Sequence, residues 1–433
     1  MSARSTCEIC RVKDFDRSVR RSLTLAVFGR GLAASAGCTY KGAVDRRAFL
    51  GLVAASVAMR AGDAHADVPA PAAPDAPKPL QALLALELRR LGHPAAAGAI
   101  VSEGRVVAAS GRGYRHKYRG GTVDSETVFR IGSVTKALTG VALLQLRDEG
   151  KLSLDDALSK LIPEAASVTY RAGEALGAPP ITLRHLVTHT SGLPRNVTNA
   201  ISEGALVAYL KGLRLEATPG AHTSYSNLGV GLLGVVIKRA SGMSLRDYMR
   251  TRVFVPLGMT SAAWEAKDVL PKRLASGNEK KKDGEKKDEI EPVDTEWRMG
   301  AAEAFGGVYA SADDLAKVAL LALSAWDSGD EPFAAVLKRS SLVEAQTAAT
   351  NGQPEPQRYG VCWWLGESGG ALDSVWHSGA TDEYSASLVT LPKQKIGAVV
   401  LTSYADVGWV ESVARRIARK AADLGPAQGG SRG

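Results

Sequence analysis

Cysteine is scarce in this chain of 433 residues, which contains four. Cys7, Cys10 and Cys38 lie in the first 66 residues, so Cys362 is the only cysteine in residues 67–433. An intramolecular disulfide in that remainder is therefore excluded. The C-x-x-C formed by Cys7 and Cys10 has no second cysteine pair or histidine cluster to complete a zinc site. We expect neither a metal nor an organic cofactor.

Two familiar hydrolase signatures, those of zinc metalloproteases and of trypsin-like serine proteases, do not identify this chain. The sequence has no H-E-x-x-H, the helical zinc motif of many metalloproteases. Residues 366–370, GESGG, resemble the nucleophile loop of trypsin-like proteases. They lie in an expected hairpin turn, however, and lack the upstream His and Asp context that such a catalytic triad needs.

Aromatic residues are few, at 6% of the chain, while 45% of residues are hydrophobic and 23% are charged. This is the balance of an ordinary soluble globular protein. The net charge is +9, but residues 1–66 contribute +6 of it, from 11 Lys and Arg against 5 Asp and Glu. The remainder carries +3 and no basic patch interleaved with aromatic residues, so nucleic-acid binding is not expected.

The leader, residues 1–66, ends in the pattern of a twin-arginine export signal. The segment DRRAFLGLVAASVAMRAGDAHA holds Arg46 and Arg47, an uncharged apolar run to Met59 and the A-x-A pattern Ala64–Ala66. Cleavage is expected before Asp67, which predicts a periplasmic or secreted protein exported by the twin-arginine route. The apolar run is too short for a bilayer span, so no stable membrane insertion is expected after cleavage.

This signal begins about forty residues into the chain, which suggests two alternatives for the leader. One hypothesis is a translation start at Val44. The other is that Arg20–Cys38 is a lipoprotein signal, which Ser35 disfavours because a lipid-attachment box takes Leu or a similar residue there.

The rest of the chain begins with a Pro/Ala-rich segment, residues 67–79, which predicts an extended linker. A helix is expected from Leu80 to Leu91, followed by two strands with a turn at Ser102–Gly104. Apolar spacing predicts that residues 131–300 are mostly helical. Within them, Asn278–Glu289 mixes both charge signs without an apolar residue, which predicts a solvated surface loop.

The C-terminal part returns to strands. Four apolar segments separated by short turns predict an antiparallel meander, closed by a basic amphipathic helix from Val410 to Leu424. Residues 425–433 are expected to be a disordered tail. The order of elements predicts an α/β (α+β) fold over residues 80–424. Both chain ends would build one antiparallel sheet flanked by helices, with a mostly helical subdomain inserted.

Three short motifs each occur once in the chain: S-x-x-K at Ser133–Lys136, Y-x-N at Tyr225–Asn227 and H-x-G at His377–Gly379. Residues i and i+3 share a helix face, so the side chains of Ser133 and Lys136 can touch. Serine is a poor nucleophile until a base takes its proton. Lysine can be that base where burial or a nearby cation lowers its pKa, and the apolar helix around Lys136 suits this.

The other two motifs fit the same chemistry. Tyr225 can exchange a proton with the serine or with a leaving group, and Asn227 can hold the lysine and a substrate amide. The strand that ends at His377–Gly379 can present the backbone N–H of Ala380. Together with the N–H of the serine itself, it would form an oxyanion hole.

With these motifs, the sequence resembles the serine-reactive penicillin-binding protein and class C β-lactamase superfamily over nearly all of residues 80–424. More narrowly, it resembles the group of D,D-carboxypeptidases, esterases and D-amino-peptide hydrolases. The most similar segments are Val128–Asp156, Leu183–Pro194, Ser224–Ile237, Val253–Met259 and Phe305–Lys317. The resemblance implies a β-lactamase/transpeptidase-like fold. It also implies that Ser133 is the acylated nucleophile and that Lys136 and Tyr225 are its proton-transfer partners.

Two positions depart from the family's pattern. His377 occupies a position where β-lactamases usually have lysine, so a fixed cation for an antibiotic's carboxylate is lost at neutral pH; many peptidase- and esterase-like members have histidine there. Glu383 stands where a glycine commonly precedes the aromatic residue. It either places a carboxylate near the pocket mouth, which would disfavour anionic substrates, or faces solvent on its strand.

Several recognisable residues are expected to be structural. His185 and His189 would support the site from behind, and Ser311 with Asp314 would cap a helix. The aromatic residues expected in the core or the pocket wall are Trp363, Trp364 and Trp376.

The sequence therefore predicts an exported, monomeric serine hydrolase that acts through an acyl-enzyme on amide or ester bonds. A D,D-carboxypeptidase or β-lactamase-like enzyme acting on a small peptide, lactam or ester is the leading hypothesis. One alternative is a carboxylesterase on the same scaffold. The other is a catalytically silent homologue that binds cell-wall peptide.

Overall fold

The computed structural model describes residues 78–170, 179–196, 202–215, 217–270, 272–280, 290–293, 298–348 and 357–425. The expectations for the leader, for linker residues 67–77, for residues 281–289 and for residues 426–433 lie outside this set. Lys78 and Pro79, expected in the linker, already belong to the first described helix. A proline is tolerated there because the first-turn N–H groups of a helix have no intrahelical partner.

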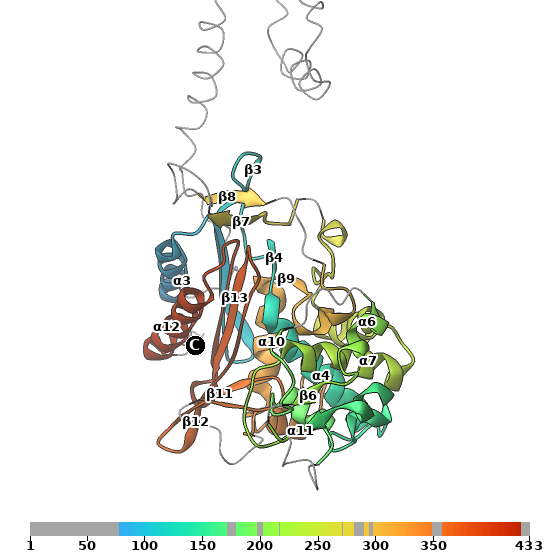
Figure 1. The fold of residues 1–433 in the computed structure, drawn as a ribbon. Coiled ribbons are helices and arrows are strands. Elements are labelled where there is room, and N and C mark those ends of the chain that lie inside the picture. The colour runs from blue at the N-terminus through green and yellow to red at the C-terminus, as the bar shows by residue number, and fades with distance from the viewer. Residues whose placement is uncertain are drawn as a thin grey trace, which may run out of the picture. The chain divides into compact units, whose positions relative to one another are not determined.

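An eight-stranded antiparallel sheet forms the centre of the fold, in the order β10-β11-β12-β13-β14-β1-β2-β3 (Figure 1). Its strands are β1 (Ala95–Ser102), β2 (Arg105–His116), β3 (Gly120–Thr122), β10 (Gln357–Tyr359), β11 (Trp364–Ser368), β12 (Ala371–Ala380), β13 (Ser385–Leu391) and β14 (Ile396–Thr402). Since β1 pairs with β14, the sheet is built from both ends of the described chain, which confirms the expected architecture.

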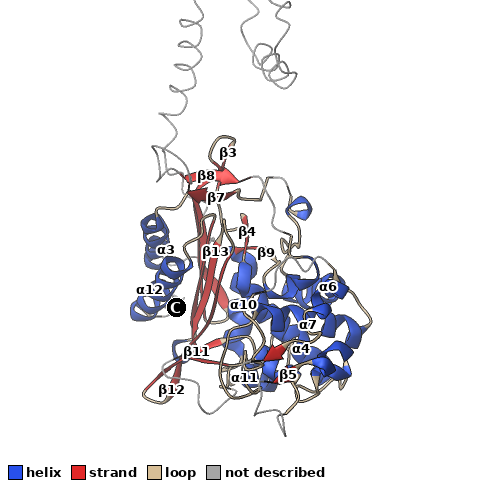
Figure 2. Cartoon of the chain, in the orientation of Figure 1, coloured by secondary structure: helices blue, strands red, loops and turns tan. Residues whose placement is uncertain are grey.

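Helices cover both faces of this sheet. Figure 2 shows α3 (Lys78–Leu91) and α12 (Val407–Leu424) on one face and α10 (Ala312–Ser324) with the remaining helices on the other. The residues of β1 therefore alternate between two cores with the period of two that strands impose. Ala97 and Ala99 pack in the core of the helical part, and Ala96 and Ile100 pack against α3 and α12.

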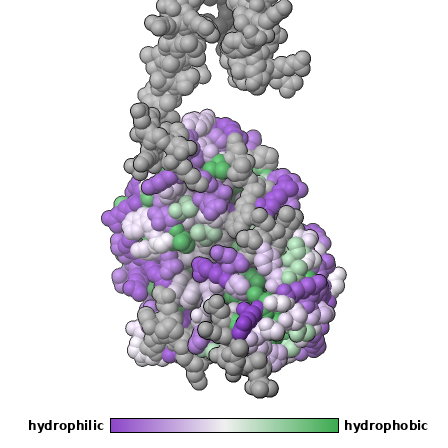
Figure 3. All heavy atoms as spheres, viewed as in Figure 1, coloured by the Kyte–Doolittle hydropathy of each residue, from purple (hydrophilic) through white to green (hydrophobic). Residues whose placement is uncertain are grey.

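The helix α12 begins at Val407, three residues before the expected start, because the side chain of Asp406 accepts a hydrogen bond from the Trp409 N–H and caps it. Its apolar residues recur at helical spacing and pack against the sheet. On the other side of α12, Arg416 and Lys420 donate to the buried carboxylate of Glu87 in α3, at 2.8 and 2.9 Å. Hydrophilic residues cover much of the described surface seen in Figure 3.

The part between the two halves of the sheet is mostly helical, as expected. Its helices are α4 (Thr135–Asp148), α5 (Leu183–Val187), α6 (Glu203–Ala208), α7 (Asn227–Ser241), α8 (Leu245–Tyr248), α9 (Val255–Leu257), α10 and α11 (Arg339–Ala345). Short 3₁₀ turns are η2 (Gly132–Val134), η3 (Leu158–Lys160), η4 (Pro163–Ser167), η6 (Ala266–Asp268), η7 (Gly300–Phe305) and η8 (Pro392–Gln394). Two-stranded pairs join β4 (Val128–Arg130) to β9 (Tyr309–Ser311), β5 (Thr169–Tyr170) to β6 (Arg214–Leu215) and β7 (Gly277–Lys280) to β8 (Ile290–Val293).

The helical segment from Leu245 to Leu257 is interrupted. Between α8 and α9 the chain forms a π-helical turn, Met249–Phe254. Pro256 has no N–H to donate to the carbonyl of Arg252, four residues earlier. The side-chain amide of Gln145 donates to that carbonyl instead, at 2.9 Å. The segment ends at Gly258, whose φ of 70° is the left-handed conformation that favours glycine after a helix.

The expectation of a solvated loop from Asn278 was wrong for its first residues. Residues Asn278–Lys280 belong to β7, and Asn278 is buried. Its side-chain amide donates to the backbone carbonyls of Ser276 and Ser403, at 2.9 and 3.0 Å. A polar residue inside a charged run is thus buried because partners distant in the sequence satisfy it.

Among the described residues, no single helix is long and apolar enough to cross a membrane. The segments Asn227–Ser241 and Leu245–Leu257 meet such a test only as a pair bent by 77°.

Candidate active site

The strand β4 delivers Ser133 to the start of α4 through the turn η2. Gly132 has φ 50°, and a Cβ on it would lie 2.8 Å from both the N and the O of Ala380. Only glycine accepts this backbone angle and this approach without strain. The Ser133 side chain is thereby held beside the end of β12, while Lys136 lies one helical turn further along.

Lys136 is fully buried, and its Nζ lies 2.9 Å from the Oγ of Ser133. The same Nζ donates to Asn227 Oδ1 at 2.9 Å and to the carbonyl of Phe305 at 2.8 Å. Within the described ranges, no carboxylate pairs with it. Burial therefore holds the pKa of Lys136 well below its usual range, and the positive charge of Arg195 adds to this effect. A lysine in this state is a base for the serine hydroxyl.

Tyr225 behaves in the opposite way. Burial raises the pKa of its hydroxyl, although a hydrogen bond with Ser133 acts to lower it, so the phenol stays protonated at neutral pH. Lys136 Nζ lies 4.8 Å from the centroid of the Tyr225 ring. The structure thus places a lysine with a lowered pKa and a tyrosine with a raised pKa around the same serine hydroxyl.

His189 fixes the position of Tyr225 from behind. Its carbonyl accepts from the N–H of Ser224 at 2.6 Å, and its Nδ1 accepts from the N–H of Ser226 at 3.2 Å. The imidazole also packs against the Tyr225 ring, with 4.1 Å between the centroids. His189 is therefore placed as a support, as the sequence suggested.

Asn227 is the first residue of α7, directly after Ser226, which caps this helix through a hydrogen bond from the Gly229 N–H. Because Oδ1 of Asn227 accepts from Lys136, its Nδ2 donors remain for other groups. The backbone N–H of Asn227 donates to the carbonyl of Arg195 at 2.8 Å. Asn227 therefore connects the lysine to the loop that carries Arg195.

The backbone around Gly379 and Ala380 suits an oxyanion hole. A Cβ at Gly379 would lie 2.5 Å from the N of Ser133, so only glycine lets β12 approach this closely. The N–H of Thr381 donates to the carbonyl of Tyr384 on the β13 side. Since N–H directions alternate along a strand, the N–H of Ala380 points to the other side, where Ser133 lies. Two backbone donors can thus meet beside the serine Oγ.

Both ring nitrogens of His377, which was expected to support the substrate and oxyanion site, have partners within the protein. Its Nδ1 donates to the carbonyl of Ser378 at 2.8 Å, and its Nε2 lies 3.0 Å from the hydroxyl of Tyr359. A carbonyl can only accept, so Nδ1 carries the proton and Nε2 accepts from Tyr359. Burial lowers the pKa of His377 to about 3, with the Lys136 charge contributing. The imidazole is therefore neutral at physiological pH.

Motif searching missed Tyr359 and Arg195. Tyr359 is fully buried, and its ring lies 4.6 Å from that of His189 and 4.8 Å from that of Trp364, by centroids. It therefore joins β10 to the aromatic wall that backs Tyr225. Arg195 is exposed, and its guanidinium carbon lies 5.0 Å from the Tyr225 ring centroid. No spacing pattern indicates either residue.

The remaining expectations mostly concern structural residues. His185 accepts from the Thr182 N–H through Nδ1 and completes the cap of α5, and Ser311 with Asp314 forms the expected capping box of α10. Trp364 stacks on Tyr225 at 6.3 Å, which makes it pocket wall. Cys362 is buried near Lys136, and desolvation raises the pKa of its thiol to about 12, so it stays protonated.

Glu383 is buried against β7, so the alternative that it faces solvent is wrong. A Cβ on Gly277 would lie 2.5 Å from the Glu383 Cβ, and the Thr381 hydroxyl donates to the Glu383 carboxyl at 3.1 Å. Burial raises the pKa of this carboxyl, although the Thr381 hydrogen bond opposes the shift.

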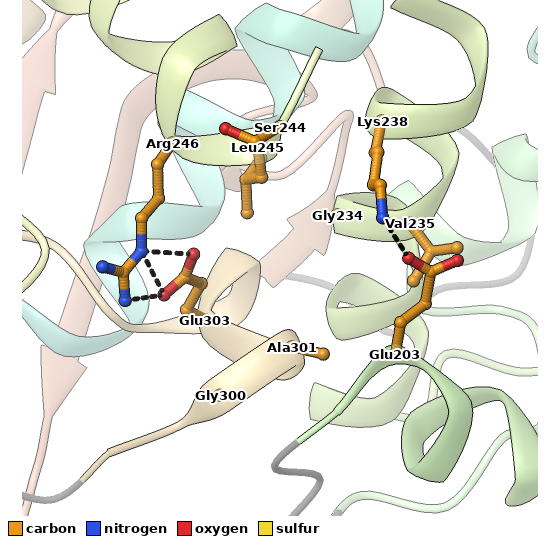
Figure 4. Close-up of a pocket in the computed structure, with 10 residues that line it drawn as sticks. All are labelled: Glu203, Gly234, Val235, Lys238, Ser244, Leu245, Arg246, Gly300, Ala301 and Glu303. Carbon is orange, nitrogen blue, oxygen red and sulfur yellow. Dashed lines mark hydrogen bonds and ion pairs between the residues drawn. The ribbon is translucent and has the colours of Figure 1, made fainter. Parts of the chain in front are cut away.

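A cavity of about 330 Å³ lies elsewhere in the helical part, between α7, α8 and η7 (Figure 4). The two cations that line it point at carboxylates: Lys238 pairs with Glu203 at 2.8 Å and Arg246 with Glu303 at 2.8 Å. These charges are already paired, and Ser133 does not line the cavity. We therefore do not assign the cavity to the candidate active site, which stays at Ser133. In the part of the chain that the structure describes, no three His, Cys, Asp or Glu side chains gather as metal ligands.

Comparison with known proteins agrees with this geometry. Residues 80–423 match the family described as Beta-lactamase. Protein flp of Staphylococcus aureus (strain COL) is 27% identical over 339 residues, which are 76% of this chain and 63% of that protein. The chain thus spans less than two thirds of this relative. The D-alanyl-D-alanine-carboxypeptidase/endopeptidase AmpH of Escherichia coli (strain K12) is 34% identical over 158 residues, 34% of this chain and 40% of that protein.

Two solved structures share the fold. The octameric penicillin-binding protein homologue from Pyrococcus abyssi superposes with a TM-score of 0.65 and 26% identity, covering 80% of this chain and 76% of that chain. The beta-lactamase/D-alanine carboxypeptidase from Pseudomonas syringae superposes with a TM-score of 0.64 and 23% identity, covering 79% and 99%. The second likeness bears on the fold alone.

Proposed function

The chain belongs to the beta-lactamase family, part of a superfamily of serine hydrolases, and from this premise we propose that it is an exported serine hydrolase acting through an acyl-enzyme at Ser133. The leading substrate class is a small peptide ending in D-Ala-D-Ala, which makes the chain a D,D-carboxypeptidase. The partial likeness to a protein named D-alanyl-D-alanine-carboxypeptidase/endopeptidase supports this class. Export rests on the twin-arginine segment, and we propose a monomer in the periplasm or outside the cell.

One observation carries the proposal: a lysine without a carboxylate partner among the described residues lies 2.9 Å from the serine hydroxyl. The neutral amine of Lys136 accepts the Ser133 proton while Oγ attacks the substrate carbonyl carbon. The N–H groups of Ser133 and Ala380 stabilise the oxyanion. Lys136 then holds the proton that the leaving group needs.

Tyr225 completes the transfer. Its hydroxyl donates a proton to the leaving nitrogen or oxygen as the C–N or C–O bond breaks, and the Lys136 ammonium replaces that proton. The acyl group stays on Ser133 as an ester. Water then attacks this ester with Lys136 and Tyr225 in the reverse roles, which releases the acid and restores the serine. In this sequence of steps Lys136 is the base and Tyr225 the acid, because burial moves their pKa values in the directions described above.

The alternatives from the sequence are tested together with the proposal. The purified chain and its Ser133→Ala variant are incubated with a fluorescent penicillin, an activated short-chain ester and a D-Ala-D-Ala peptide, and intact mass and product release are followed. The expected result is cleavage of the peptide and a penicilloyl adduct on Ser133. We expect both to fall by at least about 1,000-fold in the variant.

Fast ester turnover without an adduct or peptide cleavage would identify a carboxylesterase. A folded chain that neither forms an adduct nor turns over any substrate would contradict the hydrolase and leave the peptide-binding homologue.

A further inference from the structure

Arg195 is a cation at the rim of the Ser133 site that the acyl-enzyme chemistry does not use. Its guanidinium lies over the Tyr225 ring at 5.0 Å, and its backbone carbonyl is held by the N–H of Asn227 at 2.8 Å. The side chain is exposed, and no Asp or Glu pairs with it in the described ranges of the chain. Several other arginines of the helical part do pair with carboxylates, as Arg239 does with Glu203 and Arg246 with Glu303. Arg195 is thus anchored by its backbone but keeps its guanidinium donors.

The H-x-G motif, His377–Gly379, supplies no cation to this site. His377 stands at the end of β12, where a positive side chain could meet a substrate carboxylate, but both of its ring nitrogens are occupied within the protein. The amine of Lys136 already makes hydrogen bonds with Ser133, Asn227 and the carbonyl of Phe305. If an anionic group of the substrate is recognised beside Tyr225, Arg195 is the exposed side chain positioned to do so.

The position of Arg195 also indicates which part of the substrate it meets. Lys136 and Arg195 both lie over the Tyr225 ring, at 4.8 and 5.0 Å from its centroid. The Lys136 amine and the Arg195 guanidinium are therefore within about 10 Å of each other, a span that three residues of extended chain cover. Tyr225 is the group that protonates the leaving group, so a neighbour of Tyr225 lies on the leaving-group side of the scissile bond.

We propose that Arg195 is a specificity-determining residue that binds a carboxylate on the departing part of the substrate, the terminal carboxylate of a released amino acid. This inference rests on the proposed function and deepens it by naming the residue that recognises the free C-terminal carboxylate of the substrate. A guanidinium forms two parallel hydrogen bonds to a carboxylate, which adds orientation as well as attraction.

The test compares two substrates that differ only in charge. An N-acetylated tripeptide ending in D-Ala-D-Ala is assayed with a free C-terminal carboxylate and as its carboxamide, using the full chain, Arg195→Gln and Arg195→Lys. The wild type should prefer the carboxylate. In Arg195→Gln we expect the ratio of kcat/KM values, carboxylate over carboxamide, to fall roughly 10- to 100-fold, mostly through KM. Arg195→Lys should recover part of the ratio, because lysine restores the positive charge but cannot form the two parallel hydrogen bonds of a guanidinium.

The matched control is Arg105→Gln, an exposed arginine at the β1–β2 turn. Arg105 lies at the opposite end of the sheet from Ala380. The β1–β2 turn is beside the start of β14, because Ser102 pairs with Ile396. Ala380 is level with the end of β14, because it pairs with Ser385, which pairs with Thr402. This variant should leave the ratio unchanged. An Arg195→Gln variant that loses the same factor on both substrates would overturn the proposal, since Arg195 would then act only through the charge it places beside Tyr225.

A binding measurement separates this proposal from the hydrolase itself. Calorimetric titration of both tripeptides into Ser133→Ala, with and without Arg195→Gln, needs no turnover. A carboxylate preference that disappears with Arg195→Gln supports the recognition role even if no substrate is cleaved. Binding of neither peptide, or equal binding of both, would overturn it even if Ser133 proved reactive.

Discussion

Two fully buried ionisable residues, Glu87 and Lys136, differ in how their surroundings shift their pKa values. Glu87 lies between α3 and α12, where Arg416 and Lys420 donate to its carboxylate. Burial acts to raise its pKa, but the hydrogen bonds from Lys420 and Arg416 outweigh it and the pKa is lowered, so Glu87 stays ionised. Lys136 has neutral partners, so burial lowers its pKa and favours the uncharged amine.

The difference lies in the partners. An opposite charge within hydrogen-bond distance compensates desolvation, and the result is a structural ion cluster. Asn227 and Phe305 accept hydrogen bonds from Lys136 without carrying a negative charge, so they hold the amine in place and leave it a base. The fold thus joins two helices through an ionised Glu87 and holds Lys136, with a lowered pKa, beside Ser133.

The largest expected effect comes from making the Lys136 site resemble the Glu87 site. In Asn227→Asp the amide becomes a carboxylate of the same shape, 2.9 Å from Nζ. Its charge should raise the pKa of Lys136 and keep the amine protonated at pH 7. We expect kcat/KM at pH 7 to fall by about 100- to 1,000-fold and to recover at higher pH.

The measurement is a pH profile of kcat/KM on the substrate that the wild type cleaves. Asn227→Ala is the control, because it removes the same hydrogen-bond acceptor without adding charge and should leave the acid limb in place. An acid limb that does not move in Asn227→Asp would refute the role of the partner's charge.

A smaller effect is expected from Glu87→Gln. The variant leaves Arg416 and Lys420 without their carboxylate, but both are partly exposed and can be solvated, so we expect a loss of about 1–3 kcal/mol in the free energy of unfolding at pH 7. The pKa of Glu87 is lowered in the folded state, so its contribution is present above its ordinary value of 4.5 and is lost as pH falls through the folded pKa.

Urea unfolding of both proteins between pH 7 and pH 3 checks this prediction. The difference in the free energy of unfolding between the wild type and Glu87→Gln should shrink below about pH 4.5. Asp247→Asn, which removes an exposed pair with Arg250, should cost little by comparison. A gap that widens on acidification would contradict the sign.

The smallest expected effect has the opposite sign. The unfolded chain binds a proton at Lys136 up to its ordinary pKa of 10.5, whereas the folded chain binds it less tightly because its pKa is lowered, which costs stability below pH 10.5. Lys136→Met removes this cost in a similar volume, so we expect an inactive protein that is more stable by about 0.5–2 kcal/mol at pH 7. The advantage should shrink as pH rises towards 10.5, because the wild-type free energy of unfolding rises with pH over this window.

Urea unfolding at pH 7 and pH 9 measures both features. A Lys136→Met protein that is less stable than the wild type at pH 7 would mean that the three hydrogen bonds from Nζ outweigh its desolvation, and the contrast with Glu87 would fail.

Much of the architecture follows from local patterns in the chain. Apolar alternation, turn residues and helix caps predicted the strands β1, β2 and β11–β14, the helices α3 and α12, and the mostly helical part between the two halves of the sheet, because backbone geometry sets these periods. The break at Pro256 and the strand at Asn278 escaped prediction. Each depends on a partner distant in sequence, Gln145 in the first case and Ser403 in the second.

The sequence by itself determined the juxtaposition of Ser133 and Lys136, since three residues along a helix bring two side chains to one face whatever surrounds them. It also determined the family, through ordered motifs spread over residues 80–423. Only the tertiary structure decided the charge states. Asn227 reaches Lys136 across 91 residues, Phe305 across 169, and Arg416 reaches Glu87 across 329. A pKa depends on which groups lie within a few ångströms, and in this protein those neighbours come from distant parts of the chain.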